Sequence, residues 1–340
     1  MRMKAMHLAI MLFLAGFIQL LGGPPHSIRH QEDLVLMDLE RFQELSINLY
    51  HPDEAGEWPV IIFSHAEGGN PQQLEHLGRA WAESGWISIF PHHKDFTDGP
   101  KDHAWVQSAF PEFQSSALLH QSGIARVQDV KFLMDALEQV QMNTLPRGIQ
   151  IRHDRIGLGG YAFGAYTQMQ LAGARVKRED PMNEHEVVED SRPMAFLFIS
   201  PPGTCDQLAL DQSSWDRMTR PMMVVTGQAD IGPKGEPGSW RRAVFEKSPP
   251  GDKFMLWFER GLSRSFISPP PAEVRRSPFP IRQAFPSING AEQYEVFKSV
   301  RDATLLFWRA YLDEDPDSRD LLEIGELPLK PAIPHSLLQR

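Results

Sequence analysis

Residues 157–168 read GLGGYAFGAYTQ, and their spacing is that of a turn built to present a reactive side chain. The five residues from Gly160 to Gly164 match G-x-S-x-G, in which a strained strand-to-helix turn exposes a nucleophilic serine. Both glycines are in place, but the nucleophile position holds Ala162. Because a methyl group cannot attack a carbonyl, the pattern predicts a fold element and not, by itself, an activity.

Acyl-transfer chemistry needs three further groups beside a serine: an imidazole base, a carboxylate that orients it, and N–H donors for the oxyanion. Asp230 follows the apolar run PMMVVTG and fits the carboxylate. The N–H of Phe163 and one from the segment HAEGG, at Ala66 or Glu67, fit the donors. Glu67 would place a carboxylate near developing negative charge, which is unfavourable in a dry site unless the side chain points to solvent.

The elements that must position these residues alternate between strand-like and helix-like stretches. The run WPVIIFSH is short, apolar and bounded by a proline and a glycine-rich loop, which is typical of a central parallel strand. Apolar residues at helical spacing, closed by Gly85, predict a helix further on. We predict strands at 45–52, 58–65, 86–93, 154–160, 193–200, 221–227 and 253–259, and helices at 73–85, 122–141, 163–173 and 299–312.

Such alternation implies right-handed crossovers and a mostly parallel sheet that is covered on both faces. The predicted fold class is therefore α/β, in a single domain that spans residues 34–325. Residues 326–340 are predicted to be a proline-containing C-terminal tail. Because loops at strand ends build the sites of such folds, we expect three insertions to form a lid: residues 98–121, 175–192 and 263–292.

Five segments, taken in order, resemble α/β-hydrolases of the dienelactone hydrolase and platelet-activating-factor acetylhydrolase-like group. WPVIIFSHAEGG is similar to their PVIVFSHGxGG, and DRIGLGGYAFGAYT to their DRIGVxGHSFGAYT. PMMVVTGQADIGP and GDKFMLWFERGLSRSF are similar to the segments that deliver the catalytic acid and histidine, and TLLFWRAYL to the terminal helix. The resemblance covers residues 34–325. It implies an α/β-hydrolase fold, with a mostly parallel, doubly covered sheet and loop insertions that form a lid.

The resemblance also implies a triad in the order serine, acid, histidine, and two of the three are missing. Ala162 stands for the serine, Asp230 matches the acid, and the place of the histidine falls on Ser263 or Arg264. The interval between residues 185 and 335 contains no histidine. We therefore predict that the triad has been dismantled and that the chain has no ordinary esterase activity.

The former substrate cleft is where we expect a small apolar or ester-like ligand to bind, between candidate residues His65, Tyr161 and Phe266. A second expectation concerns the retained acid. Arg264, if it lies beside Asp230, would form an ion pair in place of the histidine–acid bond.

Other kinds of site find little support in the sequence. His65, His92 and His93, with Asp95, are the candidate metal ligands, but histidines at strand ends are more often hydrogen-bonded loop residues. The segment GLGG lacks the third glycine and the downstream acid of a dinucleotide site, so neither a metal nor a cofactor is predicted. Cys205, the single cysteine, excludes an intramolecular disulfide and is predicted to be a buried, inert thiol. A formal net charge of −10 argues against a nucleic-acid partner.

The N-terminus carries a separate signal. MRMK supplies positive charge, and the apolar run that follows ends before Pro24, which is a signal-peptide pattern. No A-x-A cleavage site follows, so residues 1–23 are either a signal peptide or an N-terminal membrane anchor. We expect export to the periplasm or the extracellular space, and contact with a membrane only through this segment.

The sequence therefore indicates an exported, catalytically inactive α/β-hydrolase-fold protein that binds a ligand or partner through its former active site. Fold alone does not fix function, so two alternatives stay open. One is a carboxylic-ester hydrolase with a rearranged catalytic set, such as His92 or His93 with a nucleophile on an insertion. The other is a scaffold protein of the cell envelope.

Overall fold

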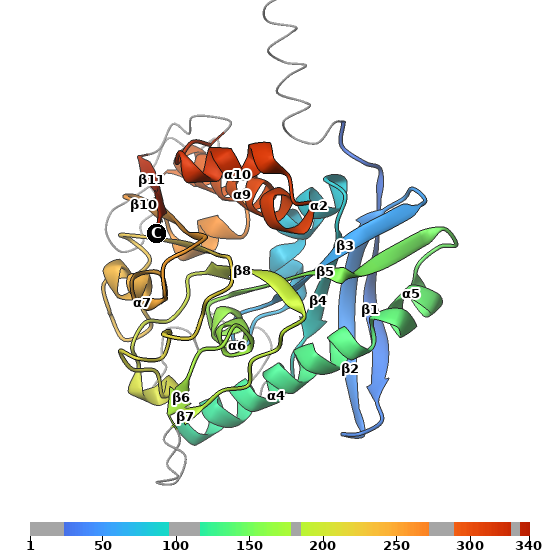
Figure 1. Cartoon of the computed structure of the whole chain (residues 1–340), viewed down its shortest axis with the longest axis horizontal. Coiled ribbons are helices and arrows are strands. Elements are labelled where there is room, and N and C mark those ends of the chain that lie inside the picture. Colours follow the sequence, from blue (N-terminus) through green and yellow to red (C-terminus); the bar gives the residue numbers. More distant parts are fainter. Residues whose placement is uncertain (1–23, 95–115, 178–184, 272–288, 328–333) are drawn as a thin grey trace, which may run out of the picture.

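The computed structural model describes residues 24–94, 116–177, 185–271, 289–327 and 334–340 (Figure 1). In these ranges nine strands form one mixed sheet, and two short strands, β6 (Val176–Lys177) and β7 (His185–Glu186), pair separately. The nine strands are β1 (Ile28–Asp38), β2 (Gln43–Pro52), β3 (Gly56–Ser64), β4 (Ile87–His92), β5 (Ile149–Tyr161), β8 (Pro193–Ile199), β9 (Met222–Gly227), β10 (Lys253–Phe258) and β11 (His335–Gln339).

The strand order across the large sheet is β1-β2-β4-β3-β5-β8-β9-β10-β11. From β4 to β10 every neighbouring pair is parallel, whereas β2 runs antiparallel to β4, and the edge strands β1 and β11 are antiparallel to their neighbours. The carboxyl ends of β3, β5, β8, β9 and β10 therefore meet at one edge of the sheet. This confirms the predicted α/β class and the mostly parallel sheet.

The central strands are buried because each is an apolar run with helices on both sides. The last six residues of β3, for example, are all buried, and Ile62 pairs with Leu158 of β5. Two separate apolar clusters flank the sheet, one on each face. The sheet is thus doubly covered, as predicted.

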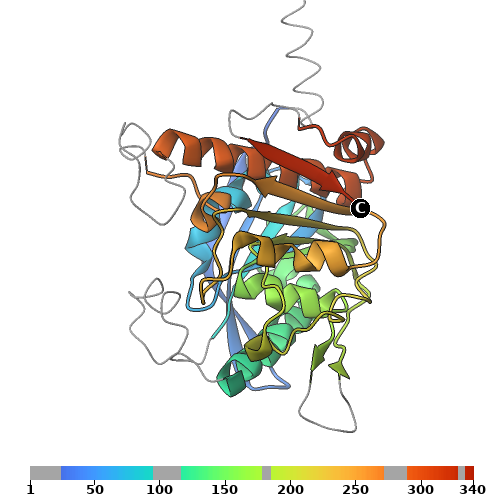
Figure 2. The same ribbon diagram turned by 90° about the vertical axis from the view of Figure 1, so that its left-hand side faces the viewer.

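Helices form the two covering layers (Figures 1 and 2). The helix α2 (Glu75–Glu83) contacts α9 (Gly290–Leu312) on one face, and α10 (Pro316–Glu323) packs against α9. The other face is covered by α4 (Ser116–Asp135), α5 (Leu137–Thr144), α6 (Phe163–Leu171) and α7 (Ala243–Lys247). Four short 3₁₀ turns complete the elements: η1 (Pro71–Leu74), η4 (Asp206–Leu208), η5 (Gly238–Arg242) and η6 (Ser263–Phe266).

All seven predicted strands are present, but several boundaries differ from the prediction. The helix expected at 122–141 is two helices that meet at Ala136. The terminal helix begins earlier than expected because Asn289 and Glu292 form a reciprocal capping box at its start. The domain starts at β1, before residue 34, and residues 335–339 of the predicted tail pair with β10 as β11.

Two predicted features lie largely or wholly outside the described residues. Residues 1–23, expected to be a signal peptide or anchor, belong to the segments that the structure leaves out, as do 98–115, 178–184 and 272–288 of the expected lid. Among the described helices, none has both the length and the apolar character needed to cross a membrane.

Candidate functional site

The turn that carries Ala162 has the backbone geometry of a nucleophile-presenting turn. It joins β5 to α6, and Ala162 is the N-cap of that helix, with φ 52° and ψ −110°. Positive φ at a residue with a side chain is a strained conformation that costs about 1–3 kcal/mol. The N–H of Ala162 donates to the carbonyl of Ile199 at 2.9 Å, which ties the strained residue to β8. The sharp turn predicted from the sequence is therefore present, with a methyl group at its apex.

Both glycines of the turn are required by close backbone approach. A Cβ on Gly160 would lie 2.2 Å from the carbonyl carbon of Gly164. A Cβ on Gly164 would lie 2.1 Å from the carbonyl oxygen of Ser64 in β3. These glycines let α6 start directly against the sheet, whether or not chemistry follows.

Asp230 is fully enclosed, and its charge is balanced by Arg241. The residue is 1% exposed, just beyond the end of β9. Its Oδ2 accepts a hydrogen bond from the Thr226 hydroxyl at 2.9 Å. Nε of Arg241 lies 3.0 Å from Oδ1 and also 3.0 Å from the main-chain oxygen of Asp230. The N–H points at the main-chain oxygen, so the contact with Oδ1 is ionic rather than a hydrogen bond.

Arg241 also fixes the loops that follow β8 and β9. Its guanidinium donates to the carbonyls of Ser200, Pro201 and Ile231 at 2.7, 3.2 and 3.3 Å. The ion pair expected from Arg264 is thus made by Arg241 instead. The prediction chose the wrong arginine because Arg241 follows a proline- and glycine-rich segment that showed no periodic pattern.

A cluster of hydroxyl groups occupies the region predicted to have lost the histidine. Ser263 Oγ lies 2.8 Å from the Tyr161 hydroxyl and 2.9 Å from Ser200 Oγ. Burial raises the pKa of the Tyr161 phenol, although its hydrogen bond with Ser263 acts the other way. The phenol is therefore neutral near pH 7. Ser263 links the other two hydroxyls in a hydrogen-bonded chain, and none of the three groups would deprotonate an alcohol.

His335, the first histidine after residue 185, does not reach this region. It begins β11 and pairs with Phe258 at the end of β10. β11 lies four strands from β5 in the sheet, and at about 4.8 Å per strand this is roughly 19 Å. No imidazole after Asp230 therefore stands beside Ala162.

The predicted oxyanion loop is held in place by Arg126, a side chain of α4 that is 1% exposed. Its guanidinium donates to the carbonyls of His65 and Ala66 at 2.6 and 3.2 Å. The same guanidinium lies 4.9 Å above the centre of the Phe163 ring. One buried cation thus contacts both segments from which oxyanion donors were predicted.

His65 lies in this loop as a neutral imidazole. Its Nε2 accepts the main-chain N–H of His93 at 3.1 Å, so the ring proton is on Nδ1, which donates to the Ala66 carbonyl at 2.6 Å. Because Nε2 is already occupied as an acceptor, His65 is not positioned to act as a base. Glu67 follows it, half-buried with Oε1 enclosed, rather than pointing wholly to solvent as the simplest expectation had it.

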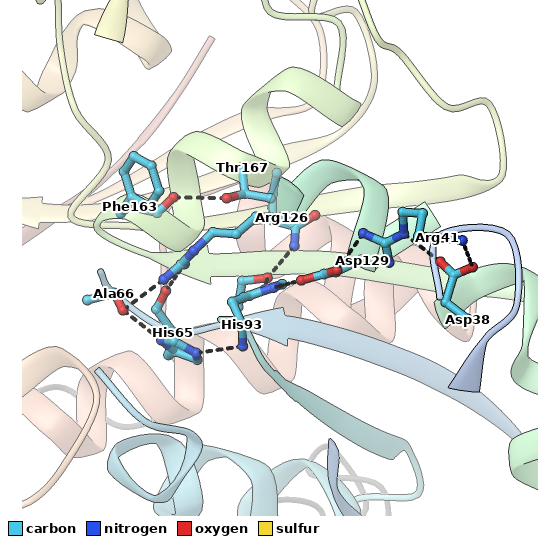
Figure 3. Close-up of polar contacts among 11 residues, drawn as sticks. Asp38, Arg41, His65, Ala66, His93, Arg126, Asp129, Phe163 and Thr167 are labelled. Atoms are coloured by element: carbon cyan, nitrogen blue, oxygen red, sulfur yellow. Dashed lines mark hydrogen bonds and ion pairs between the residues drawn. The ribbon is translucent and has the colours of Figure 1, made fainter. Parts of the chain in front are cut away.

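The structure also assembles a serine, a histidine and an aspartate that sequence patterns did not bring together. Ser64 Oγ lies 2.9 Å from Nε2 of His93. Nδ1 of His93 lies 2.9 Å from Oδ2 of Asp129, and Figure 3 shows these two side chains. Asp129 Oδ1 in turn accepts from Arg41 at 2.8 Å, and Arg41 pairs with Asp38 at 2.5 Å. The atoms follow the order of a catalytic triad.

Ser64 is too deeply buried for this arrangement to act as an active site. The Ser64 side chain has no exposed surface, and its Oγ also accepts a hydrogen bond from Nε2 of Gln168 at 2.8 Å. A substrate carbonyl cannot approach this oxygen without displacing α6 or the loop after β3. In this structure Ser64, His93 and Asp129 are therefore a buried polar network beneath the predicted oxyanion loop.

The remaining candidates have structural surroundings. Phe266, predicted to line the cleft, is fully buried and stacks on Phe258, so it belongs to the core. His92 Nε2 lies 3.0 Å from Asn48 Oδ1, and Asp95 lies outside the described residues. Within the described ranges, no cluster of three histidine, cysteine, aspartate or glutamate side chains could hold a metal ion. Cys205 is half-buried, not fully buried as predicted.

Comparison with known proteins does not assign this site. No protein-family model matches the chain, and no curated protein matches its sequence. The geometry of the site is the remaining guide to function. The strained turn at Ala162 carries no nucleophile, and the carboxylate of Asp230 is paired with Arg241.

Proposed function

We propose that this chain is a non-catalytic α/β-hydrolase-fold protein that binds a small apolar or ester-like ligand beside Ala162. The strand order supports the fold, since the first eight strands of the large sheet follow the hydrolase order, with the second strand antiparallel. The turn after β5, with its two obligatory glycines, supports it further. So do the five sequence segments that resemble the dienelactone hydrolase-like group.

The observation that carries the proposal is the conformation of Ala162. Strain of about 1–3 kcal/mol is retained at a residue that cannot react. A turn kept only to join β5 to α6 would be more stable with glycine at this position, because glycine adopts positive φ without strain. Retention of alanine at the apex is consistent with a methyl group that contacts a ligand where a serine once attacked one.

The surroundings favour a neutral ligand that carries a carbonyl group. The first N–H groups of α6 have no acceptor within the helix, and they lie beside the loop that Arg126 holds. Glu67 in that loop disfavours an anionic ligand, because two negative charges would share one small site. The hydroxyls of Tyr161 and Ser263 offer donors on the other side. Esters and amides meet these requirements, and carboxylates do not.

A second function, ester hydrolysis by Ser64, is favoured by the bonds from Ser64 through His93 to Asp129. It ranks below binding because Ser64 is enclosed and its oxygen is already hydrogen-bonded on two sides. Export and a role in the cell envelope follow only from the N-terminal sequence and form part of the same proposal.

A fluorophosphonate probe and short-chain p-nitrophenyl esters test both functions on the full chain. We expect neither labelling nor turnover, together with saturable binding of a non-hydrolysable ester analogue measured by calorimetry. Ala162→Trp should abolish that binding by filling the space above the turn, whereas Thr167→Val, one turn into α6, should leave it intact. Ala162→Ser alone should stay unlabelled, because His335, the one histidine after Asp230 in the sequence, lies four strands away from β5.

The outcomes separate the two functions. Labelling of the unmodified chain would overturn the non-catalytic proposal, and loss of that labelling in Ser64→Ala would assign the reaction to Ser64. Absence of both labelling and analogue binding would overturn the binding proposal.

A further inference from the structure

The hairpin of β1 and β2 exposes an unusual number of large apolar side chains. Of the described large hydrophobic residues that are exposed, four belong to this hairpin and its turn, and they form what we call the hairpin stripe. The members and their exposed fractions are Val35 (57%), Met37 (43%), Leu39 (74%) and Phe42 (87%).

The stripe has a structural origin in the alternation of β1. Leu36 and Asp38 face inward and are buried, so Val35 and Met37 share the opposite, outer face, and Leu39 is exposed in the turn that follows. An outer face of an edge strand is normally polar, which prevents association with other chains. At the end of β1 the exposed positions of the alternation are apolar, and Leu39 and Phe42 add exposed apolar side chains in the turn.

The turn is rigid, so the stripe is presented in a fixed shape. Asp38 Oδ1 accepts the main-chain N–H groups of Glu40 and Arg41 at 3.0 and 3.1 Å, and Oδ2 binds the guanidinium of Arg41. Arg41 reaches on to Asp129 of α4. Figure 3 shows this connection from the turn to the buried network. A surface that is already ordered loses little conformational entropy when it binds a partner.

Phe42 combines a strained backbone conformation with an exposed side chain. Its φ of 51° lies in the left-handed region, where a bulky side chain is a clear outlier. The ring is almost wholly exposed, so it contributes little apolar burial to folding. Strain and exposure of an aromatic residue at the same position point to a role in contact with another molecule.

The charged residues around the hairpin stripe indicate which kind of partner it would bind. Glu40 and Glu44 are exposed beside Leu39 and Phe42. Arg41 is the single basic residue of the segment LERFQE, and two carboxylates neutralise it. An anionic membrane would be repelled by this surface, and so would a second copy of the same acidic hairpin.

We propose that the hairpin stripe is a docking surface for a partner protein that has an apolar groove bordered by lysine or arginine side chains. Phe42 and Leu39 insert into the groove, and Glu40 and Glu44 pair with its basic rim. The contact is independent of ligand binding at Ala162, which lies at the end of β5.

Site-specific photocrosslinking of the full chain, in the cells that produce it, tests this proposal. The crosslinking amino acid p-benzoylphenylalanine replaces Phe42, and in a matched control it replaces Met142, an exposed residue of α5. We expect one discrete adduct from position 42, at least tenfold stronger than from position 142. Mass spectrometry should locate the crosslink in a partner peptide whose apolar residues are flanked by lysine or arginine.

Charge and folding controls complete the test. The double change Glu40→Lys and Glu44→Lys should weaken the adduct at least fivefold, and 0.5 M salt should weaken it similarly. Phe42→Gly should retain the native circular dichroism spectrum and melt no lower than the parent, because it relieves the strained φ. An adduct between two copies, an adduct to lipid, equal yields at 42 and 142, or insensitivity to both charge reversal and salt would each overturn the proposal.

Discussion

Replacing Ala162 with glycine tests the strained turn directly. An alanine-to-glycine change in regular structure lowers the free energy of unfolding by about 0.5–1 kcal/mol, because glycine has more freedom in the unfolded chain. At Ala162 the backbone angles of 52° and −110° add a strain of about 1–3 kcal/mol that glycine removes. The relief equals or exceeds the entropic loss, so we expect Ala162→Gly to raise the free energy of unfolding by roughly 0–2.5 kcal/mol.

Ala165 provides the matched control, since it lies in the same helix with regular geometry and is fully buried. Ala165→Gly should lower the free energy of unfolding by about 1 kcal/mol or more, from helix propensity and the lost methyl. Urea unfolding followed by tryptophan fluorescence measures both variants, and an unchanged m-value would show that the unfolded ensemble is the same. If Ala162→Gly lost as much stability as Ala165→Gly, the assignment of strain to this turn would be refuted.

Two further predictions concern the groups that support the site and the fold. Arg126→Met should lower the free energy of unfolding by about 1–3 kcal/mol, because two loop carbonyls lose their donor, and should speed hydrogen exchange in residues 65–69. Arg79→Met, at a half-exposed ion pair, is its control and should cost under about 1 kcal/mol; equal losses would contradict the role of Arg126. Desolvation opposes the shift at Asp211, but hydrogen bonds from Ser213 and Lys177 lower its pKa to about 2. Since this folded-state pKa lies below the ordinary value of 3.8, the stabilisation is complete above about pH 4 and disappears as the pH falls through 2. Because solvent screens this partly exposed carboxylate, Asp211→Asn should cost about 1 kcal/mol at pH 7 and almost nothing at pH 2, and a cost that did not change with pH in acid unfolding curves would disprove it.

The sequence predicted the strands that contain a continuous apolar run. It did not predict the edge strands β1 and β11, which form by pairing with one neighbouring strand. β3, β9 and β10 contain the buried runs VIIF, MMVV and FMLWF, each of which is apolar without interruption. β1 carries charged residues among apolar ones, and β11 lies in a segment interrupted by prolines. Both are edge strands with one partner, and no periodic pattern marks such a strand in a single sequence.

The candidate site also has one feature that the local sequence determines and one that depends on residues far apart in the chain. The turn at Ala162 was predictable because its two glycines lie four residues apart and are required by local backbone contact. The bond between His93 and Asp129 spans 36 residues, and Asp129 lies on a helix that was recognised only from apolar spacing. Polar pairs of this kind are set by how the helix packs on the sheet, which apolar spacing alone does not determine.

The ion pair with Arg241 gives a structural role to Asp230, which was predicted to be a catalytic acid. A carboxylate that is 1% exposed is costly unless a cation or hydrogen-bond donors compensate it. Arg241 supplies the compensating charge for Asp230 and at the same time donates to the carbonyls of three loop residues. Asp230 is therefore part of the structure that holds the loops after β8 and β9. A serine placed at position 162 and a histidine placed at position 263 would still leave Asp230 engaged by Arg241. Because removing Arg241 would release those loops, the contacts that stabilise the fold disfavour a working triad at these positions.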